Sequence, residues 1–256
     1  MKRTFFLGGN DLEMETIRVV LARWTSDTVV DHRLPWGARA SDYRREIDEV
    51  FHQGGQPILV ELEDDMNVQA RGGWVIDHHG PNASARPAAL DQVLDLINAP
   101  AEARNRWHAL VSANDRGHVK ALLEMGAAPE EIHAVRAADR EAQGVTPEHE
   151  RQAEQALERA ERYPNGLLVV RLSHGHTAAV MDRLDTSQRG PTQNNVLIIS
   201  PQEVNFYGDG RVIHELHRRY PNGWLGGDLP TQGFFGLACV PADIVDQVQL
   251  LVPSRP

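Results

Sequence analysis

The stretch Val75-Ile76-Asp77-His78-His79-Gly80 places one acid and two imidazoles directly after a short apolar run. The apolar run begins at Gly73 and Trp74 and is typical of a buried strand. In an open parallel sheet, ligands bind at the carboxyl ends of the strands. Histidine supplies metal-binding nitrogens or transfers protons near neutral pH, and aspartate supplies a hard oxygen ligand. The stretch therefore predicts a functional site at a strand end, and the alternative is a surface turn with ordinary histidines.

The first half of the chain alternates short apolar runs with amphipathic segments, as a parallel sheet with crossover helices requires. We expect strands over residues 3–7, 27–31, 57–62 and 73–76. We expect helices over residues 13–24, 41–52, 86–97 and 102–112. The pattern predicts an α/β fold with a parallel sheet.

The pattern changes in the second half of the chain. A stretch rich in Ala, Glu and Arg, from Pro147 to Arg162, predicts a connecting helix. Beyond it, strand-like runs and an expected hairpin, with Glu203–Tyr207 and Arg211–His214 on either side of Gly208-Asp209-Gly210, predict a smaller α+β domain. We therefore expect a first domain over 1–146, a connecting helix over 147–163 and a second domain over 164–256, with the active site in the cleft between the domains.

Composition limits the classes of partner. The 256 residues carry a formal net charge of -10, which argues against a long nucleic-acid track because such a track needs a basic face. A small anionic substrate remains compatible, since bound cations can dominate the local potential. The single cysteine, Cys239, excludes an intramolecular disulfide. No apolar run approaches the roughly 20 residues that span a bilayer and no signal peptide is evident, so we expect no membrane partner and a cytoplasmic location. The sequence leaves a homodimer open.

Acidic residues gather where the strands of the first domain should end. They are Asp11, Glu13 and Glu15 after the first strand, Glu61, Glu63, Asp64 and Asp65 after the third, Asp77 after the fourth, and Asp115 in a polar insert, 112–118, between two helical segments. Such carboxylates, with imidazoles, can hold two divalent ions about 3.5 to 4 Å apart. Asp64 and Asp65 are better explained as a solvated loop.

This order of motifs resembles the DHH phosphoesterase superfamily, which includes family II inorganic pyrophosphatases, single-strand exonucleases, oligoribonucleases and cyclic dinucleotide phosphodiesterases. The resemblance covers about residues 3 to 120. More weakly, the Gly226-Gly227-Asp228 turn resembles the Gly-Gly-His substrate motif of the DHH-associated domain. The resemblance implies a hydrolase that uses two Mn²⁺ or Mg²⁺ ions to cleave a phosphoester or phosphoanhydride bond in a small nucleotide or short oligonucleotide.

The resemblance also implies roles for individual residues. The metal ligands would be Asp11, Glu13, Glu61, Asp77, His78 and Asp115, with Asp77 either ligating directly or orienting a histidine. Asp77 and His79 would be the catalytic residues, and His79 would orient the substrate phosphate. Gly226, Gly227 and Asp228 would contact the substrate, together with His174 of Ser173-His174-Gly175-His176, which is otherwise explained as a polar turn.

Departures from the family pattern leave alternatives open. Glu13 and Glu61 stand where the family usually has aspartates, and Asp228 stands where a histidine is common. The first motif can also be read as the three acids Asp11, Glu13 and Glu15. These departures favour, as the alternative function, a weak or inactive nucleotide-binding or sensor protein with the same fold. Arg116, Arg136 and Arg140 are expected to form solvated ion pairs, with phosphate binding as the alternative.

Overall fold

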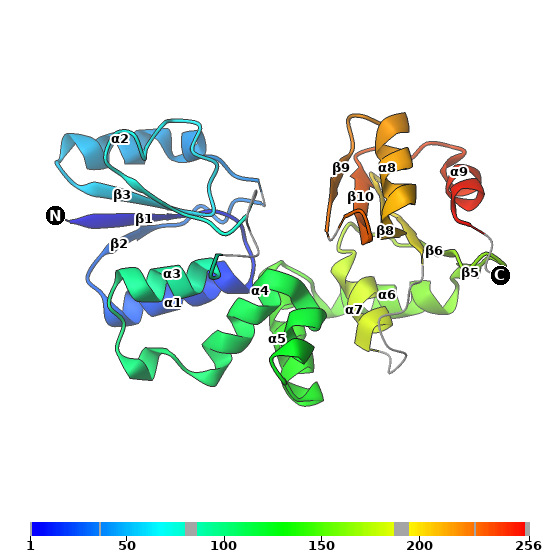
Figure 1. Cartoon of the computed structure of the whole chain (residues 1–256), viewed down its shortest axis with the longest axis horizontal. Coiled ribbons are helices and arrows are strands. Elements are labelled where there is room, and N and C mark those ends of the chain that lie inside the picture. The colour runs from blue at the N-terminus through cyan, green and yellow to red at the C-terminus, as the bar shows by residue number, and fades with distance from the viewer. Residues whose placement is uncertain (1, 36, 80–85, 187–194, 228, 254–256) are drawn as a thin grey trace. The chain divides into compact units, whose positions relative to one another are not determined.

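The computed structural model describes residues 2–35, 37–79, 86–186, 195–227 and 229–253 (Figure 1). The chain divides into two compact units, Met1–Gly144 and Val145–Pro256, and each is described by itself below. This division lies close to residue 146, where the first domain was predicted to end. Residues 147–163, predicted as a separate connecting helix, belong to the second unit.

The first unit is built on a parallel four-stranded sheet. Its strands are β1 (Arg3–Leu7), β2 (Thr28–Val30), β3 (Gln56–Val60) and β4 (Trp74–Ile76), in the order β2-β1-β3-β4. The helices are α1 (Leu12–Trp24), α2 (Arg44–His52), α3 (Ala89–Leu96), α4 (Arg106–Glu124) and α5 (Pro129–Ala142), with short 3-10 turns at Ala40–Tyr43 and Ala101–Ala103. The predicted α/β class with a parallel sheet is confirmed.

Both faces of this sheet are covered, because successive strand residues point to opposite faces. Phe5 and Leu7 pack with residues of α1, α3, α4 and α5, whereas Phe6 packs with residues of α2 on the other face. Figure 1 shows α2 on one side of the sheet and α1 and α3 on the other. With both faces buried, the strands are nearly continuous apolar runs.

The strands β1, β3 and β4 end together. Leu7 pairs with Val60, and Val60 pairs with Ile76, so Gly8, Glu61 and Asp77 follow at one edge of the sheet. A Cβ atom at Gly8 would lie only 2.2 Å from the carbonyl oxygen of Glu61, so this close approach requires glycine. Glu61 itself has a φ of 53°, a left-handed conformation that is strained for a residue other than glycine.

Helix α4 corrects the predicted position of Asp115. The helical backbone continues through this residue, and the break comes later, at Gly117 and at His118, whose φ is 49° and ψ is -142°. Helices α3 and α4 also begin three and four residues later than the ranges predicted from residues 86 and 102. Asp115 is therefore held on a helix near its break and not in a polar insert.

The second unit is an α+β fold with a six-stranded mixed sheet, as predicted in class. The sheet order is β5-β6-β7-β8-β10-β9, and β6 and β7 are its parallel pair. The elements are α6 (Pro147–Glu158), β5 (Glu161–Arg162), β6 (Leu168–Arg171), α7 (Ala178–Thr186), β7 (Val196–Ile199), β8 (Val204–Asp209), α8 (Gly210–Arg219), β9 (Trp224–Gly226), β10 (Gln232–Leu237) and α9 (Ile244–Leu251). Helices α8 and α9 cover one face, and α6 and α7 cover the other (Figure 1).

One predicted element of the second half ends early, and another was wrong. The helix predicted over Pro147–Arg162 ends at Glu158, because residues 161–162 pair antiparallel with β6. The hairpin predicted around Gly208-Asp209-Gly210 is a strand followed by α8, since the Asp209 side chain accepts the N–H of Arg211 and caps that helix. Across the residues that the structure describes, no helix has both the length and the apolar character needed to cross a membrane.

Candidate metal centre

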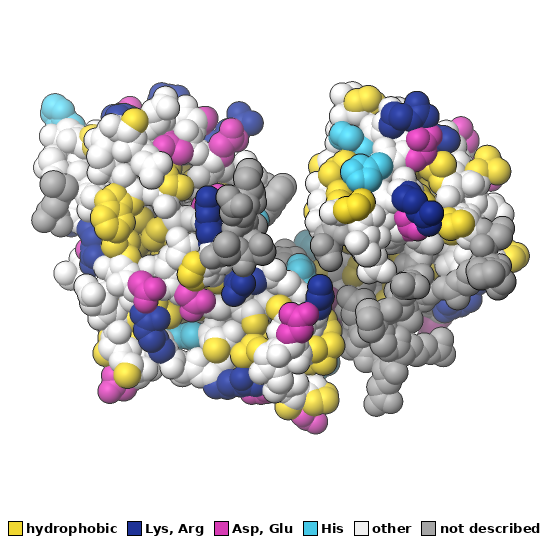
Figure 2. Space-filling model, in the orientation of Figure 1, with side chains coloured by type: hydrophobic (Ala, Val, Ile, Leu, Met, Phe, Trp, Pro, Cys, Tyr) yellow, Lys and Arg dark blue, Asp and Glu magenta, His cyan; other side chains and the backbone are white. Residues whose placement is uncertain are grey.

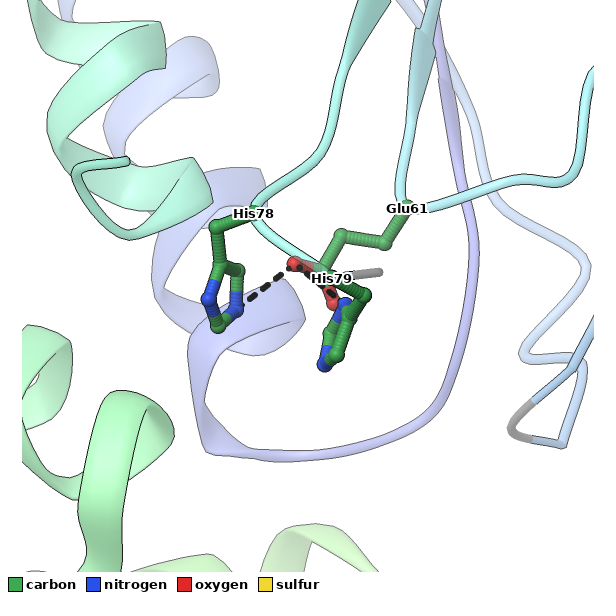
Figure 3. A group of neighbouring side chains, drawn as sticks. All are labelled: Glu61, His78 and His79. Atoms are coloured by element: carbon green, nitrogen blue, oxygen red, sulfur yellow. Dashed lines mark ion pairs between the residues drawn. The ribbon is translucent and has the colours of Figure 1, made fainter. Parts of the chain in front are cut away.

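Four side chains of the first unit converge at the carboxyl edge of its sheet. Glu13 comes from α1, Glu61 follows β3, His78 follows β4 and Asp115 comes from α4, and their ligand atoms lie within 4.8 Å of one another. His78 Nε2 is 3.0 Å from Glu61 Oε1 and 2.5 Å from Asp115 Oδ2. Figure 3 shows His78 and His79 beside the carboxylate of Glu61. We call Glu13, Glu61, His78 and Asp115 the four-ligand cluster.

The ligand atoms of the four-ligand cluster are buried and make no well-formed hydrogen bonds within the part of the chain that the structure describes. The side chains of Glu61 and His78 are 7% and 6% exposed. Among the described residues, Glu13 Oε2, Glu61 Oε1, His78 Nε2 and Asp115 Oδ2 are buried without a well-formed hydrogen bond, and three of them contact one another in the ion pairs around His78. Buried polar atoms are rarely left unpaired, because each one costs about 1 to 3 kcal/mol.

A divalent cation fits this donor set. Adjacent ligands of an octahedral ion bound at about 2.1 Å lie roughly 3 Å apart, which is close to the spacings around His78. One imidazole nitrogen and three carboxylates suit Mn²⁺, and carboxylate oxygens also suit Mg²⁺. A cation bound between the four side chains would be within reach of all four ligand atoms. The cluster can therefore bind a divalent metal.

The electrostatics of the cluster agree with this interpretation. Burial, and then the charges of Asp115 and Glu61, raise the pKa of Glu13 well above its usual value. Burial also raises the pKa of Glu61, although His78 opposes that rise. Burial lowers the pKa of His78, but the carboxylates of Asp115 and Glu61 outweigh it and bring the pKa to about 10. In the metal-free protein the cluster retains protons that a bound metal would displace.

Glu13 and Glu61 reach the cluster although each stands where the family usually has the shorter aspartate. Glu13 Oε1 accepts the backbone N–H of Leu90 at 2.8 Å, which directs its other oxygen into the cluster. The side chain of Glu61 is set by the left-handed backbone at that position. The extra methylene groups therefore do not remove these carboxylates from the site.

Asp11 lies beside the four-ligand cluster without joining it. Its Oδ1 accepts the N–H of Met14 at 2.9 Å, so it caps α1. Burial raises the pKa of Asp11 to about 7; the bond to Met14 lowers it, and Asp115 raises it further. Glu15, the third acid in the alternative first motif, instead forms an ion pair with Arg18.

Asp77 and His79 form a pair at the exposed side of the site. Asp77 Oδ1 accepts the backbone N–H of His79 at 2.7 Å and lies 3.1 Å from its Nδ1. The contact with Asp77 raises the pKa of His79, and the contact with His79 lowers the pKa of Asp77. His79 Nδ1 is also 3.5 Å from Glu61 Oε1, and Glu61, His78 and His79 form a second group with metal-binding spacing. Asp77 therefore orients His79, and its carboxylate is not in the four-ligand cluster.

The predicted substrate residues lie in the second unit. Gly226 ends β9 and Gly227 has a φ of 101°, a conformation that favours glycine. Asp228 lies outside the described residues. His174 Nδ1 accepts the N–H of His176 at 3.1 Å, and its Nε2 lies 3.1 Å from the carbonyl oxygen of His149. The approach of these residues to the metals across a cleft stays a prediction.

Sequence reasoning missed one buried group beside the site. Arg136, expected to be a solvated arginine, is 2% exposed and donates to both Asn114 and Asp139. A signal was present in the sequence, because Arg136 and Asp139 fall on the same helical stripe as the buried residues Ile132 and Val135. Charged residues on an apolar stripe indicate a buried, paired group.

Comparison with known proteins supports the fold. No family profile and no curated protein matches the chain. A solved DHH-domain protein, described as a member of a family of ribosomal proteins, matches with a TM-score of 0.62 and 13% identity, over 100% of this chain and 88% of that one. RecJ from Thermus thermophilus matches in its Mn²⁺ complex with a TM-score of 0.56 and 12% identity, over 100% of this chain and 52% of RecJ. The Mg²⁺ complex of RecJ matches with a TM-score of 0.54 and 14% identity, over 50% of RecJ. This chain, which spans about half of RecJ, therefore has the fold of the DHH-domain proteins.

Proposed function

We propose that this protein is a divalent-metal-dependent phosphoesterase that hydrolyses a phosphoester or phosphoanhydride bond in a small nucleotide or short oligonucleotide. The observation that carries the proposal is the set of four buried ligand atoms, without a well-formed hydrogen bond to any described residue, that four separate segments of the chain bring together. Structural neighbours solved with Mn²⁺ or Mg²⁺ support it. Acids buried together without a cation would cost stability, so a purely structural role explains the cluster poorly.

The four-ligand cluster would hold one ion, and Glu61 and His78 also belong to the group that contains His79. We propose that two ions would bind here, held by the four-ligand cluster together with Asp11 or His79. Bound Mn²⁺ or Mg²⁺ would supply Lewis acidity, activating water and offsetting charge on the phosphoryl oxygens. Glu13, Glu61, His78 and Asp115 would hold the ions with little rearrangement, because they are already gathered and largely buried.

His79 is the residue that we propose for orienting the phosphate. Its side chain is 43% exposed, so a substrate can reach it. The raised pKa that Asp77 gives His79 favours a positively charged imidazole. A charged imidazole makes a stronger hydrogen bond to a phosphate oxygen than a neutral one does. Asp77 would act through His79, by fixing the orientation of its ring.

The net charge of the chain is the basis for the substrate class that we propose. With a net charge of -10, the chain is poorly suited to a long polyanion. On the face drawn in Figure 2, basic and acidic side chains are interspersed over the described residues of each unit, without a continuous basic stripe. We therefore propose a small substrate, with Gly226, Gly227, Asp228 and His174 of the second unit contributing contacts.

The test is an assay of the purified protein with Mn²⁺ against pyrophosphate, cyclic dinucleotides and short oligonucleotides. Metal-dependent product formation is expected for at least one substrate, and Asp115→Ala should abolish it. Asp65→Ala is the matched control, because Asp65 accepts the N–H of Ser41 in a loop and is not in the four-ligand cluster. Failure of all three substrates with metal-loaded protein would contradict the proposal.

A nucleotide-binding protein without turnover is the second candidate function. The observation in its favour is that Asp11, an expected ligand, is engaged as the cap of α1 and lies outside the four-ligand cluster. A site that holds one ion in place of two would bind phosphate yet hydrolyse it slowly. Calorimetry that shows nucleotide binding in Mn²⁺, with no product after prolonged incubation, would favour this function.

A further inference from the structure

A buried chain of polar contacts joins the two helices that carry Glu13 and Asp115. Asp139 of α5 accepts the backbone N–H of Leu12 through Oδ1, at 3.2 Å. Its other oxygen accepts from Arg136 at 2.8 Å, and the same Arg136 nitrogen donates to Asn114 at 2.8 Å. Leu12 directly precedes Glu13, and Asn114 directly precedes Asp115. Helix α5 therefore contacts the chain next to two members of the four-ligand cluster.

The ion pair between Arg136 and Asp139 lies in the protein interior. Asn114 and Asp139 are each 4% exposed, and Arg136 is almost fully buried. Replacing such an ion pair with apolar residues often leaves stability unchanged or higher, so general stability explains the pair poorly. In some proteins buried ionic groups instead fix one arrangement of the elements that they join. The elements joined here are α1, α4 and α5.

The cluster needs such a restraint when it holds no metal. Glu13 and Asp115 come from different helices, and their ligand atoms lie within 4.8 Å of each other. Both carboxylates must be ionised to bind a cation, and in that form their like charges repel each other. This repulsion favours separation of α1 from α4. Two contacts oppose that separation. Asp139 accepts the N–H of Leu12, the first residue of α1, and Arg136 donates to Asn114 on α4.

We infer that Arg136 and Asp139 are positioning residues that hold Glu13 and Asp115 at metal-binding distance before the metal arrives. The inference rests on the proposed function, because it assumes that the four-ligand cluster binds a divalent cation. Neither residue contacts the substrate or the metal in this account. Their effect is to reduce the rearrangement that accompanies metal binding, which raises affinity.

The chain offers a matched control on the same two helices. Arg106 of α4 and Glu131 of α5 form a two-bond ion pair, with nitrogen–oxygen distances of 2.8 and 2.7 Å. This pair is exposed at the surface, and neither residue neighbours a member of the four-ligand cluster in sequence. Arg106→Ala therefore removes an α4–α5 ion pair without touching the contacts beside Glu13 and Asp115.

The experiment measures the Kd for Mn²⁺ alone, from the electron paramagnetic resonance signal of free Mn²⁺, in the full chain. The variant Arg136→Met with Asp139→Asn removes both charges together and keeps an oxygen for the N–H of Leu12. We expect its Kd to rise about 10- to 100-fold, the usual effect of losing a residue that orients metal ligands. The Kd of Arg106→Ala should equal that of the wild type.

Urea unfolding of the metal-free variants separates positioning from stability. An unchanged Kd in a folded double variant would overturn the inference, as would an equal rise in Arg106→Ala. Should the double variant not fold, Asn114→Ala tests the same link with the Arg136–Asp139 pair intact, and an unchanged Kd would again overturn it. A wild-type protein that bound no Mn²⁺ would instead overturn the proposed function, and the inference with it.

Discussion

Leu90, the second residue of α3, donates its backbone N–H to Oε1 of Glu13 at 2.8 Å, and the other oxygen of Glu13 is buried without a hydrogen-bond partner among the described residues. One carboxylate thus combines a structural bond with an unsatisfied atom aimed into the four-ligand cluster. The two oxygens have different roles, and a substitution can separate them.

Glu13→Gln keeps an oxygen for Leu90 and removes the negative charge from the cluster. In the metal-free protein at neutral pH we expect the free energy of unfolding to rise by about 1 kcal/mol, because an amide carries no cost of ionisation or proton uptake in this buried acidic site. The affinity for Mn²⁺ should fall at least about tenfold. Urea unfolding and calorimetry measure the two effects. Unchanged Mn²⁺ affinity would remove Glu13 from the ligand set.

His78→Ala and Asp64→Ala form a matched pair of substitutions on loops that follow adjacent strands. His78→Ala should abolish tight metal binding, since it removes the nitrogen nearest to both Glu61 and Asp115. Asp64 accepts the N–H groups of Val68 and Gln69, so its loss should cost about 1 kcal/mol of stability and leave metal content normal. Metal analysis after dialysis checks both, and equal metal loss would contradict the assignment.

The strand ends of the first unit could be predicted from the sequence because apolar runs lead directly into acids and histidines. The four-ligand cluster followed from that pattern and from the family resemblance. Asp11 stays an expected ligand: its Oδ1 caps α1 through the bond to Met14, and the sequence does not distinguish a helix cap from a metal ligand. The contact of Arg136 with Asn114 could not be predicted, because the two residues lie 22 positions apart in the chain, whereas the buried stripe shared with Asp139 could have been read from the sequence. The glycines at 208 and 210 led to the prediction of a hairpin, although Val212, Ile213 and Leu216 have the spacing of a buried helix face.

The histidines of the second unit should make its stability depend on pH. Burial lowers the pKa of His174 and of His176 below the usual 6.5; the bond to the His149 carbonyl opposes this for His174, and the charge of His149 lowers the pKa of both. Their neutral forms are favoured in the folded state, so the stabilisation is present above pH 6.5 and is lost as the pH falls below that value. The urea midpoint for unfolding of the second unit should therefore be lower at about pH 5.5 than at about pH 7.5.

His174→Gln should reduce this pH dependence. His52, an exposed residue at the end of α2, provides the control, and His52→Gln should leave the difference between the two pH values unchanged. Nuclear magnetic resonance titration of the histidine ring protons gives the pKa of His174 directly. A measured value above 6.5 would refute this explanation.

Gly8→Ala should disturb the site from the backbone side. The new Cβ atom would lie 2.2 Å from the carbonyl oxygen of Glu61, and that backbone cannot move without shifting a member of the four-ligand cluster. We expect a loss of about 1 to 3 kcal/mol in stability and weaker Mn²⁺ binding. Gly175→Ala is the control, because its Cβ would meet only the side chain of Glu203, at 3.6 Å. Normal Mn²⁺ affinity in Gly8→Ala would mean that this contact does not set the position of Glu61.

The most direct measurement is an anomalous-scattering map of crystals soaked with Mn²⁺. We expect a peak about 2.0 to 2.3 Å from each of four ligand atoms, namely Glu13 Oε2, Glu61 Oε1, His78 Nε2 and Asp115 Oδ2. A second peak sharing Glu61 would support the two-ion arrangement. The absence of a peak among these four side chains at saturating Mn²⁺ would contradict the assignment of the four-ligand cluster as a metal site.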